Sequence, residues 1–216
     1  MSNQNHLLKF AYLLLFTAYT VYAIITGNVN VFFLIYIFWI DEFLKTLFDL
    51  FRYLFLKENI KDAIDFLNNL KARFFMLFLY FVFIVILYGF VFSFGETYES
   101  IGNNILILFF RDTAFNICFL TLLAREINGF IISMYKKEVT SVMVNSSGII
   151  TLHVSIILGA FAWAAVNNKF DWININLGSL NNYIYIFPFI VIKFLFEMYE
   201  IRSNYKKGKV VASLEN

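Results

Sequence analysis

The sequence has few of the residues from which metal centres and disulfide scaffolds are built. Its 216 residues include one cysteine, Cys118, and two histidines, His6 and His153. A lone cysteine excludes an internal disulfide and any site made of several thiolates. The chain has no H-E-x-x-H pattern and no paired haem ligands, so we expect no metal, no other cofactor and no catalytic residues. The sequence therefore favours a protein without enzymatic activity.

Charged residues are also scarce. Lys, Arg, Asp and Glu make up 15% of the chain, whereas 61% is hydrophobic, 29 residues are Phe, and the mean hydropathy is +0.72. Soluble domains carry about 25% charged residues. The chain has no internal repeat, no low-complexity tract and no basic patch in a base-stacking context. The composition therefore predicts an integral membrane protein and excludes nucleic acid as a partner.

Six apolar runs are long enough to cross a bilayer. A span needs about 20 mostly apolar residues, and its backbone has to bond to itself, so each run is interpreted as a helix. Between the second and third runs we expect a short amphipathic helix at the membrane surface. The expected fold is an all-α transmembrane bundle forming a single domain, 1–216. Its spans are 7–26, 29–51, 74–94, 104–124, 148–166 and 183–198, the last bent near its start at Pro188.

The basic residues outside these runs fall mostly on one side. Thirteen Lys and Arg lie in the termini, between runs two and three, and between runs four and five, against Lys169 alone on the other side. Segments rich in Lys and Arg stay in the cytoplasm. Both termini are therefore expected in the cytoplasm, in a bacterial inner membrane or plasma membrane with the lipid bilayer as the surrounding partner.

Charges interrupt the second run, "YIFWIDEFLKTLFDLFRYLF" (36–55). Asp41, Glu42, Lys45 and Asp49 follow spacings of three and four residues, which place them on one helical face. This face has to point away from lipid, because a charge at mid-bilayer costs about 2.5 to 3.5 kcal/mol on insertion scales. The pattern predicts a buried polar core in the cytoplasmic half of the membrane, built by spans two, four, five and six. Its candidate partners on the later spans are Arg111, Asp112, Asn116, His153, Lys193 and Glu197.

Three stretches stand at the ends of their spans: "FWIDEFLKTLFDLFR" (38–52), "LHVSIILGAF" (152–161) and "KFLFEM" (193–198). Together they resemble an uncharacterised family of small bacterial multi-pass membrane proteins. The resemblance implies membrane residence and no known activity. It implies that Asp41 stands where members carry Glu, that Glu42 and Asp49 stand where they carry Asn, and that several residues match: Trp39, His153, Gly159, Lys193 and Glu197.

The same resemblance concerns two tyrosines in the third span. Family members favour two histidines eight residues apart, and this chain has Tyr80 and Tyr88 at that spacing. Eight residues is just over two helical turns, so both side chains face roughly the same side. The two tyrosines are therefore candidates for a relay. If the family histidines bind metal, this chain lacks two of the ligands.

Three roles compete for the polar core. Small-solute or proton-linked transport or sensing would use buried carboxylates such as Asp41, Glu42 or Asp112 as proton acceptors. A scaffold or anchor subunit would use the same charges only to determine which helix faces which. A membrane metal-binding protein is least favoured because its ligands are few. The sequence favours transport or sensing and names no protein partner.

Overall fold

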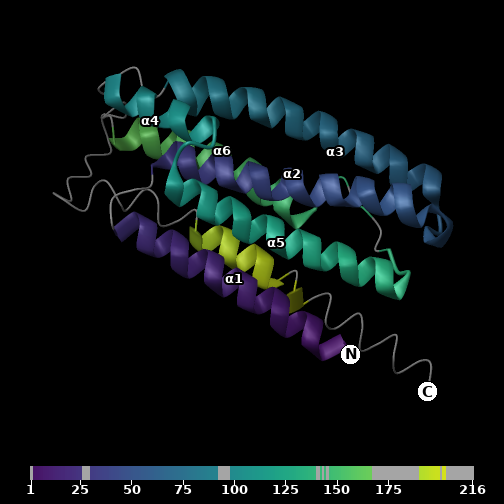
Figure 1. Ribbon diagram of the computed structural model, residues 1–216. Coiled ribbons are helices and arrows are strands. Elements are labelled where there is room, and N and C mark those ends of the chain that lie inside the picture. Colours follow the sequence, from purple (N-terminus) through teal and green to yellow (C-terminus); the bar gives the residue numbers. More distant parts are fainter. Residues whose placement is uncertain are drawn as a thin grey trace.

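The computed structural model consists of helices that run side by side (Figure 1). It describes residues 2–25, 30–91, 98–139, 142, 144, 146–166, 190–199 and 201–202. The labelled helices are α1 (Ser2–Ile25), α2 (Val31–Leu56), α3 (Ala63–Phe83), α4 (Tyr98–Leu108), α5 (Thr113–Lys136) and α6 (Ser147–Val166). A 3₁₀ turn, η1 (Lys57–Asn59), follows α2, and a π-helical stretch, η2 (Ile84–Phe90), continues α3. The helix at 190–199 is called the last helix here. The described residues contain no strand, which confirms the all-α class.

α2 lies inside the bundle (Figure 1). Every residue from Phe32 through Glu42 is buried, and α2 contacts α3, α4, α5 and α6. A helix that is apolar all round its circumference is stable when it is buried. The rings of Phe32, Tyr36 and Trp39 stack along it with centroid separations of 5.6 and 5.8 Å. The Trp39 indole N–H donates to the carbonyl of Leu77 on α3 at 2.7 Å, so α3 is anchored to this central helix.

α3 is longer than the sequence predicts. It begins at Ala63, after the Asp62 side chain accepts a hydrogen bond from the Asp65 N–H at 2.9 Å, and it continues directly into η2. The prediction of a separate surface helix before the third span is therefore wrong. α5 likewise continues to Lys136, well beyond the predicted end at residue 124. Hydropathy makes both segments too short, starting the first too late and ending the second too early, because charged residues enter while one side of each helix stays buried.

The predicted fourth span, 104–124, is broken by a turn. Phe110 takes a left-handed backbone conformation with φ of 58°, and α5 begins after Asp112. The Asp112 carboxylate accepts from the Phe115 N–H at 2.6 Å, which satisfies one of the free N–H groups of the first turn. The Phe110 ring packs against Phe115 and Phe119 at 5.5 and 5.1 Å. This segment is therefore two helices, α4 and α5.

Two amides connect the start of α2 to its neighbours. Asn30 caps α2 by accepting from the Phe33 N–H at 2.8 Å, and its amide donates to the side-chain oxygen of Asn104 on α4 at 2.7 Å. Asn104 is buried and donates to the carbonyls of Tyr88 and Gly89 at 3.4 and 3.3 Å. These carbonyls belong to η2, where the backbone departs from regular α-helical bonding. Asn30 and Asn104, called the amide pair below, therefore connect α2, α4 and η2.

Replacing Asn104 should show how much the amide pair contributes to the stability of the fold. Asn104→Ala leaves the Asn30 amide without its acceptor and removes the donor to the η2 carbonyls. Buried polar groups left unpaired cost about 1–3 kcal/mol each. We expect the free energy of unfolding of the purified protein to fall by about that amount. The exposed neighbour Asn103 provides the control, and equal losses for Asn103→Ala and Asn104→Ala would contradict the role given to Asn104.

Large apolar side chains cover the outside of the bundle. Phe78 on α3 is 61% exposed, Leu120 on α5 is 58% exposed, and Phe161 on α6 is 60% exposed. α1 adds Leu14 and Leu15 to this surface. Soluble monomers rarely expose contiguous apolar patches larger than a few hundred Å², so the outer surface calls for an apolar environment.

Two helical stretches, Ala63–Phe90 and Ile101–Lys136, are long and apolar enough to cross a membrane. The second stretch contains the turn before α5. Six spans with cytoplasmic termini therefore stay a prediction. The expectations for Lys169, for the bend at Pro188 and for residues 183–189 lie outside the described residues.

Candidate functional site

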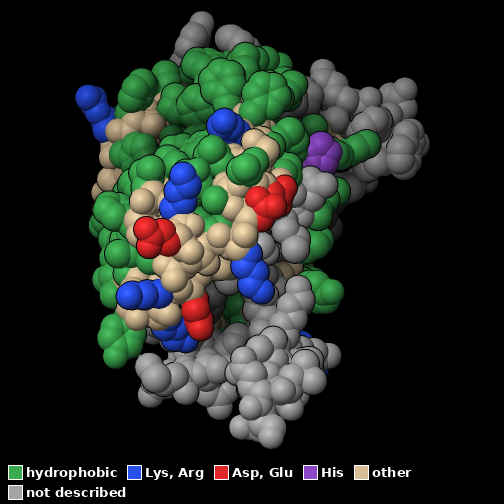
Figure 2. All heavy atoms as spheres, turned by 90° about the vertical axis from the view of Figure 1, so that its right-hand side faces the viewer, with side chains coloured by type: hydrophobic (Ala, Val, Ile, Leu, Met, Phe, Trp, Pro, Cys, Tyr) green, Lys and Arg blue, Asp and Glu red, His purple; other side chains and the backbone are tan. Residues whose placement is uncertain are grey.

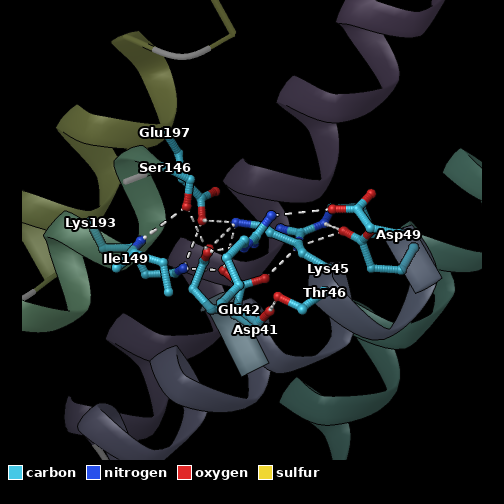
Figure 3. A network of polar contacts seen from close by, with 12 residues as sticks. Asp41, Glu42, Lys45, Thr46, Asp49, Ser146, Ile149, Lys193 and Glu197 are labelled. Carbon is cyan, nitrogen blue, oxygen red and sulfur yellow. Dashed lines mark hydrogen bonds and ion pairs between the residues drawn. The ribbon is translucent and has the colours of Figure 1, made fainter. Parts of the chain in front are cut away.

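Ten charged side chains from four helices meet at and beyond the middle of α2 (Figure 3). Five are carboxylates and five are cations, so the group is neutral when all are ionised. We call this group the charge network. Its members are Asp41, Glu42, Lys45, Asp49, Arg52, Arg73, Arg125, Glu126, Lys193 and Glu197.

Asp41 lies at the centre of the charge network. Its side chain is fully buried. One carboxylate oxygen accepts from the Arg125 guanidinium on α5, and the other accepts from the Lys193 ammonium on the last helix. Lys45, one turn further along α2, has its nitrogen 3.4 Å from the second oxygen. Charge-assisted hydrogen bonds are the stronger kind, so this one carboxylate joins α2, α5 and the last helix.

Glu42 faces the start of α6. Its carboxylate lies 2.7 Å from the Lys45 nitrogen and 3.4 Å from Arg73 on α3, and it accepts from the Ser146 hydroxyl at 3.3 Å. A Cβ built on Gly148 would overlap this carboxylate. The start of a helix carries a partial positive charge that stabilises a carboxylate. α6 therefore approaches Glu42 closely because residue 148 has no side chain.

A second part of the charge network lies about two turns further along α2. Asp49 binds Arg52 at 2.6 Å and Arg73 at 3.2 Å, so Arg73 bridges the two parts. Glu126 on α5 lies 2.9 Å from Arg125 and 4.0 Å from Arg52. Removing either partner of a buried ion pair leaves a charge uncompensated, and shared partners limit this cost.

The last helix contributes an i,i+4 pair. The Lys193 nitrogen lies 2.6 Å from the Glu197 carboxylate, and Glu197 lies 4.0 Å from Lys45. The Lys193 nitrogen also lies over the rings of Phe16 and Phe38, 5.4 and 4.9 Å from their centroids. Aromatic faces attract a desolvated cation, so Lys193 has both ionic and ring partners. In Figure 3, Lys193, Glu197 and Ser146 approach Asp41 and Glu42 from the side opposite to Asp49.

A cavity of about 10 Å³ adjoins the charge network, room for about one water molecule. Pockets that bind organic ligands measure about 300–1,000 Å³, so a small solute does not fit beside the charges in this conformation. The cavity is lined by Phe38, Glu42, Gly148, Thr151, Leu152, Lys193, Phe196 and Glu197.

The structure brings together six of the predicted site residues, namely Asp41, Glu42, Lys45, Asp49, Lys193 and Glu197. Arg111, Asp112 and Asn116 do not join them, because these residues lie at the start of α5, whereas Arg125 lies in its middle. Asp112 lies about 20 Å along the helix from Arg125, at 1.5 Å per residue. Arg111 is exposed, and the Asn116 amide donates to the carbonyl of the turn residue Phe110 at 2.9 Å.

His153 also lies apart from the charge network, exposed on α6. Its Nδ1 is 3.2 Å from the Tyr80 hydroxyl, and the Tyr88 hydroxyl donates to the carbonyl of Ile156. Both relay candidates therefore face α6. No group of three or more His, Cys, Asp or Glu among the described residues is placed to hold a metal ion.

Sequence reasoning missed three members of the charge network: Arg73, Arg125 and Glu126. Helical spacing does place Arg52 on the charged face of the second span, three residues after Asp49. Arg73 and Arg125 stand in segments that the charge count assigns to the cytoplasm. A periodic signal was present, because Arg73 lies three residues after Leu70 and four before Leu77, both buried on α3. Arg125 similarly follows buried Leu122 by three residues. A charge in phase with an apolar face belongs to the same buried side of the helix.

The end of the bundle nearest η1 carries charges of both signs. Figure 2 views this end, where charged side chains stand among hydrophobic ones. The exposed cations here include Lys57, Lys61, Lys71 and Lys137. These lysines lie on the segments that the charge count predicts to be cytoplasmic.

Comparisons of the chain with protein-family models, curated proteins and solved structures find no match. The function is therefore argued from the charge network and its surroundings.

Proposed function

We propose that the chain is an integral, multi-pass membrane protein with six spans and both termini in the cytoplasm of a bacterial cell. The exposed apolar side chains of α1, α3, α5 and α6 support membrane residence. The charge network supports it as well, since intramembrane ionisable residues face the interior of a bundle and pair with one another. The exposed lysines near η1 support a cytoplasmic location for that end.

Within that setting we propose proton-linked transport, with Asp41 as the carboxylate that takes up and releases the proton. The observation that carries the proposal is that Asp41, fully buried, binds cations from two other helices. Protonation of Asp41 removes the charge that attracts Arg125 and Lys193. Each cation has a second carboxylate in reach, Glu126 at 2.9 Å and Glu197 at 2.6 Å. α5 and the last helix can then shift relative to α2 without stranding a charge.

The size of the cavity beside Glu42 supports a proton rather than a small solute as the species handled here. About 10 Å³ admits about one water, which can carry a proton but leaves no room for an organic molecule. A sensor would use the same protonation of Asp41 and the same helix shift without net flux.

The second candidate is a scaffold or anchor subunit. It is favoured by the pairing of every carboxylate in the charge network with at least one cation. In a scaffold, such a balanced group would have one role, to specify which helices pack together. In the transport candidate, protonation of Asp41 is a step of the activity. In the scaffold candidate, the charge of Asp41 affects only folding and packing.

A flux measurement separates these candidates. The protein is reconstituted into vesicles that enclose a pH-sensitive dye, and an imposed pH gradient is followed with the membrane potential clamped by potassium and valinomycin. We expect wild-type vesicles to acidify faster than protein-free ones. The charge-balanced double variant Asp41→Asn/Lys193→Gln should fold, since Arg125 keeps Glu126. Its flux should be at least about tenfold lower than that of the wild type, which corresponds to about 1.4 kcal/mol in activation free energy.

Asp112→Asn is the matched control, because it removes a carboxylate while Asn caps a helix as well as Asp does. Its flux should equal that of the wild type. A wild-type rate no greater than that of protein-free vesicles, with the fold retained, would favour the scaffold. Undiminished flux in the double variant would remove Asp41 from the mechanism.

A further inference from the structure

We propose that Thr151, Ser155 and Tyr88 line a proton path that joins the charge network to the amide pair at the start of α2; this inference rests on the proposed proton-linked function. The path runs along the side of α6 that faces α2. It would connect two polar regions, the charge network and the amide pair. Between these regions α2 is surrounded by apolar side chains.

The first part of the path is a row of small and hydroxyl-bearing residues on α6. Gly148, Thr151, Ser155 and Gly159 are separated by three, four and four residues, so they share one helical face. Gly148 meets the Glu42 carboxylate, and Thr151 lines the cavity beside the charge network. The row therefore starts at the carboxylates that the proposed function uses.

Ser155 is the observation that distinguishes this row from ordinary helix packing. Its side chain is fully buried, and its hydroxyl has no hydrogen-bond partner among the described residues. The large majority of buried side-chain polar atoms are paired, because leaving them unpaired destabilises the fold. An alanine at this position would avoid that cost. The retained hydroxyl is therefore explained by a partner that comes and goes, such as a water molecule carrying a proton.

The spacing suits a path through hydroxyls and single waters. Successive positions four residues apart on α6 are separated by about 6 Å along the helix. Two hydrogen bonds of about 2.8 Å through one water span about the same distance. At each hydroxyl a proton arrives on the oxygen lone pair while the original O–H proton leaves on the far side. Thr151 and Ser155 are thus unchanged after each passage, and no charge accumulates on them.

The far part of the path is formed by η2 and the amide pair. A Cβ on Gly159 would lie 2.6 Å from the Tyr88 hydroxyl, so the glycine leaves room for the phenol beside α6. The Tyr88 hydroxyl donates to the carbonyl of Ile156, one residue after Ser155. The backbone carbonyl of Tyr88, at the other end of that residue, accepts from Asn104, whose side-chain oxygen accepts from Asn30. Tyr88 therefore extends from the hydroxyl row to the amide pair, and the amide pair would hold water at the start of α2 without relaying the proton itself.

The test uses the vesicle flux assay with variants of Ser155. Ser155→Ala removes the hydroxyl and should lower the proton flux at least about fivefold, whereas Ser155→Thr keeps a hydroxyl and should retain most of it. The midpoint of thermal unfolding should stay equal or rise for Ser155→Ala, because an unpaired hydroxyl is lost. A purely structural role for Ser155 would lower that midpoint and leave the flux per folded protein unchanged.

The matched control is Thr121→Val on α5, which removes a hydroxyl that donates to the carbonyl of Ile117 on the exposed side. Its flux should equal that of the wild type. Tyr88→Phe is a second, independent variant and should lower the flux as Ser155→Ala does. If both path variants conduct like the wild type while Asp41→Asn/Lys193→Gln does not, the path is overturned and the proton-linked function stands. If the wild type conducts no protons, both fail.

Discussion

Asp41→Asn is expected to be the most destabilising single substitution in the charge network. The change leaves Arg125 and Lys193 facing a neutral amide in a fully buried position. Removing one partner of a buried ion pair costs about 3–5 kcal/mol, and because Arg125 keeps Glu126 and Lys193 keeps Glu197, the cost here should lie at the lower end of that range. We expect the free energy of unfolding in detergent to fall by about that amount, measured by chemical denaturation with tryptophan fluorescence as the signal.

The charge-balanced variant provides the internal check. In a double-mutant cycle with Lys193→Gln, the two changes should cost less together than the sum of the single variants. Residues in contact show coupling energies of about 0.5–3 kcal/mol, and this pair should lie toward the upper end. Asp112→Asn, whose side chain caps α5 outside the network, should have almost no effect. A cost below about 1 kcal/mol for Asp41→Asn would mean that Glu126 and Glu197 are enough to compensate Arg125 and Lys193.

Gly148→Ala is expected to have the second largest effect. The added methyl group would occupy the position of the Glu42 carboxylate. This carboxylate cannot simply swing aside, because Lys45, Arg73 and Ser146 all bind it. Overpacking a well-filled interior costs about 1–3 kcal/mol, and we expect Gly148→Ala to fall at the upper end of that range in the same denaturation experiment.

Two variants show whether the collision itself is the cause. Gly102 on α4 has open space where a Cβ would lie, so Gly102→Ala should leave stability unchanged or raise it by about 0.5–1 kcal/mol. Glu42→Asp shortens the carboxylate and should reduce the cost of Gly148→Ala when the two are combined. A destabilisation of equal size at residues 102 and 148 would point to a general intolerance of alanine and not to contact with Glu42.

Spacing along one helix made part of the charge network predictable. On α2, Lys45 lies three and four residues from the acids on either side of it, and Lys193 and Glu197 are four apart, so helical geometry alone placed each set on one face. The requirement that charges avoid lipid then turned both faces inward. Both predictions needed only the sequence within one helix.

Partners from different helices could not be chosen in the same way. Asp41 and Arg125 are 84 residues apart, and spacing within α5 can place Arg125 on a buried face but cannot say which acid it meets. Counting residues to judge depth assumed that the fourth span was unbroken, but the chain turns at Phe110 and Asp112 caps the start of α5. Arginines near the cytoplasm also satisfy two rules at once, since they can mark orientation or pair with buried acids.

The π-helical segment η2 has a geometric consequence for the two tyrosines. Eight residues of regular α-helix rotate by about 800°, which leaves the eighth side chain about 80° away from the first. Tyr80 and Tyr88 nevertheless both meet α6, at His153 and Ile156. The wider turn of η2 takes up part of that angular difference. Regular α-helical winding over Ile84–Phe90, with its length unchanged, would turn the phenol of Tyr88 by up to about 80° away from Gly159, so the π-helical winding of this segment sets the direction in which that ring points.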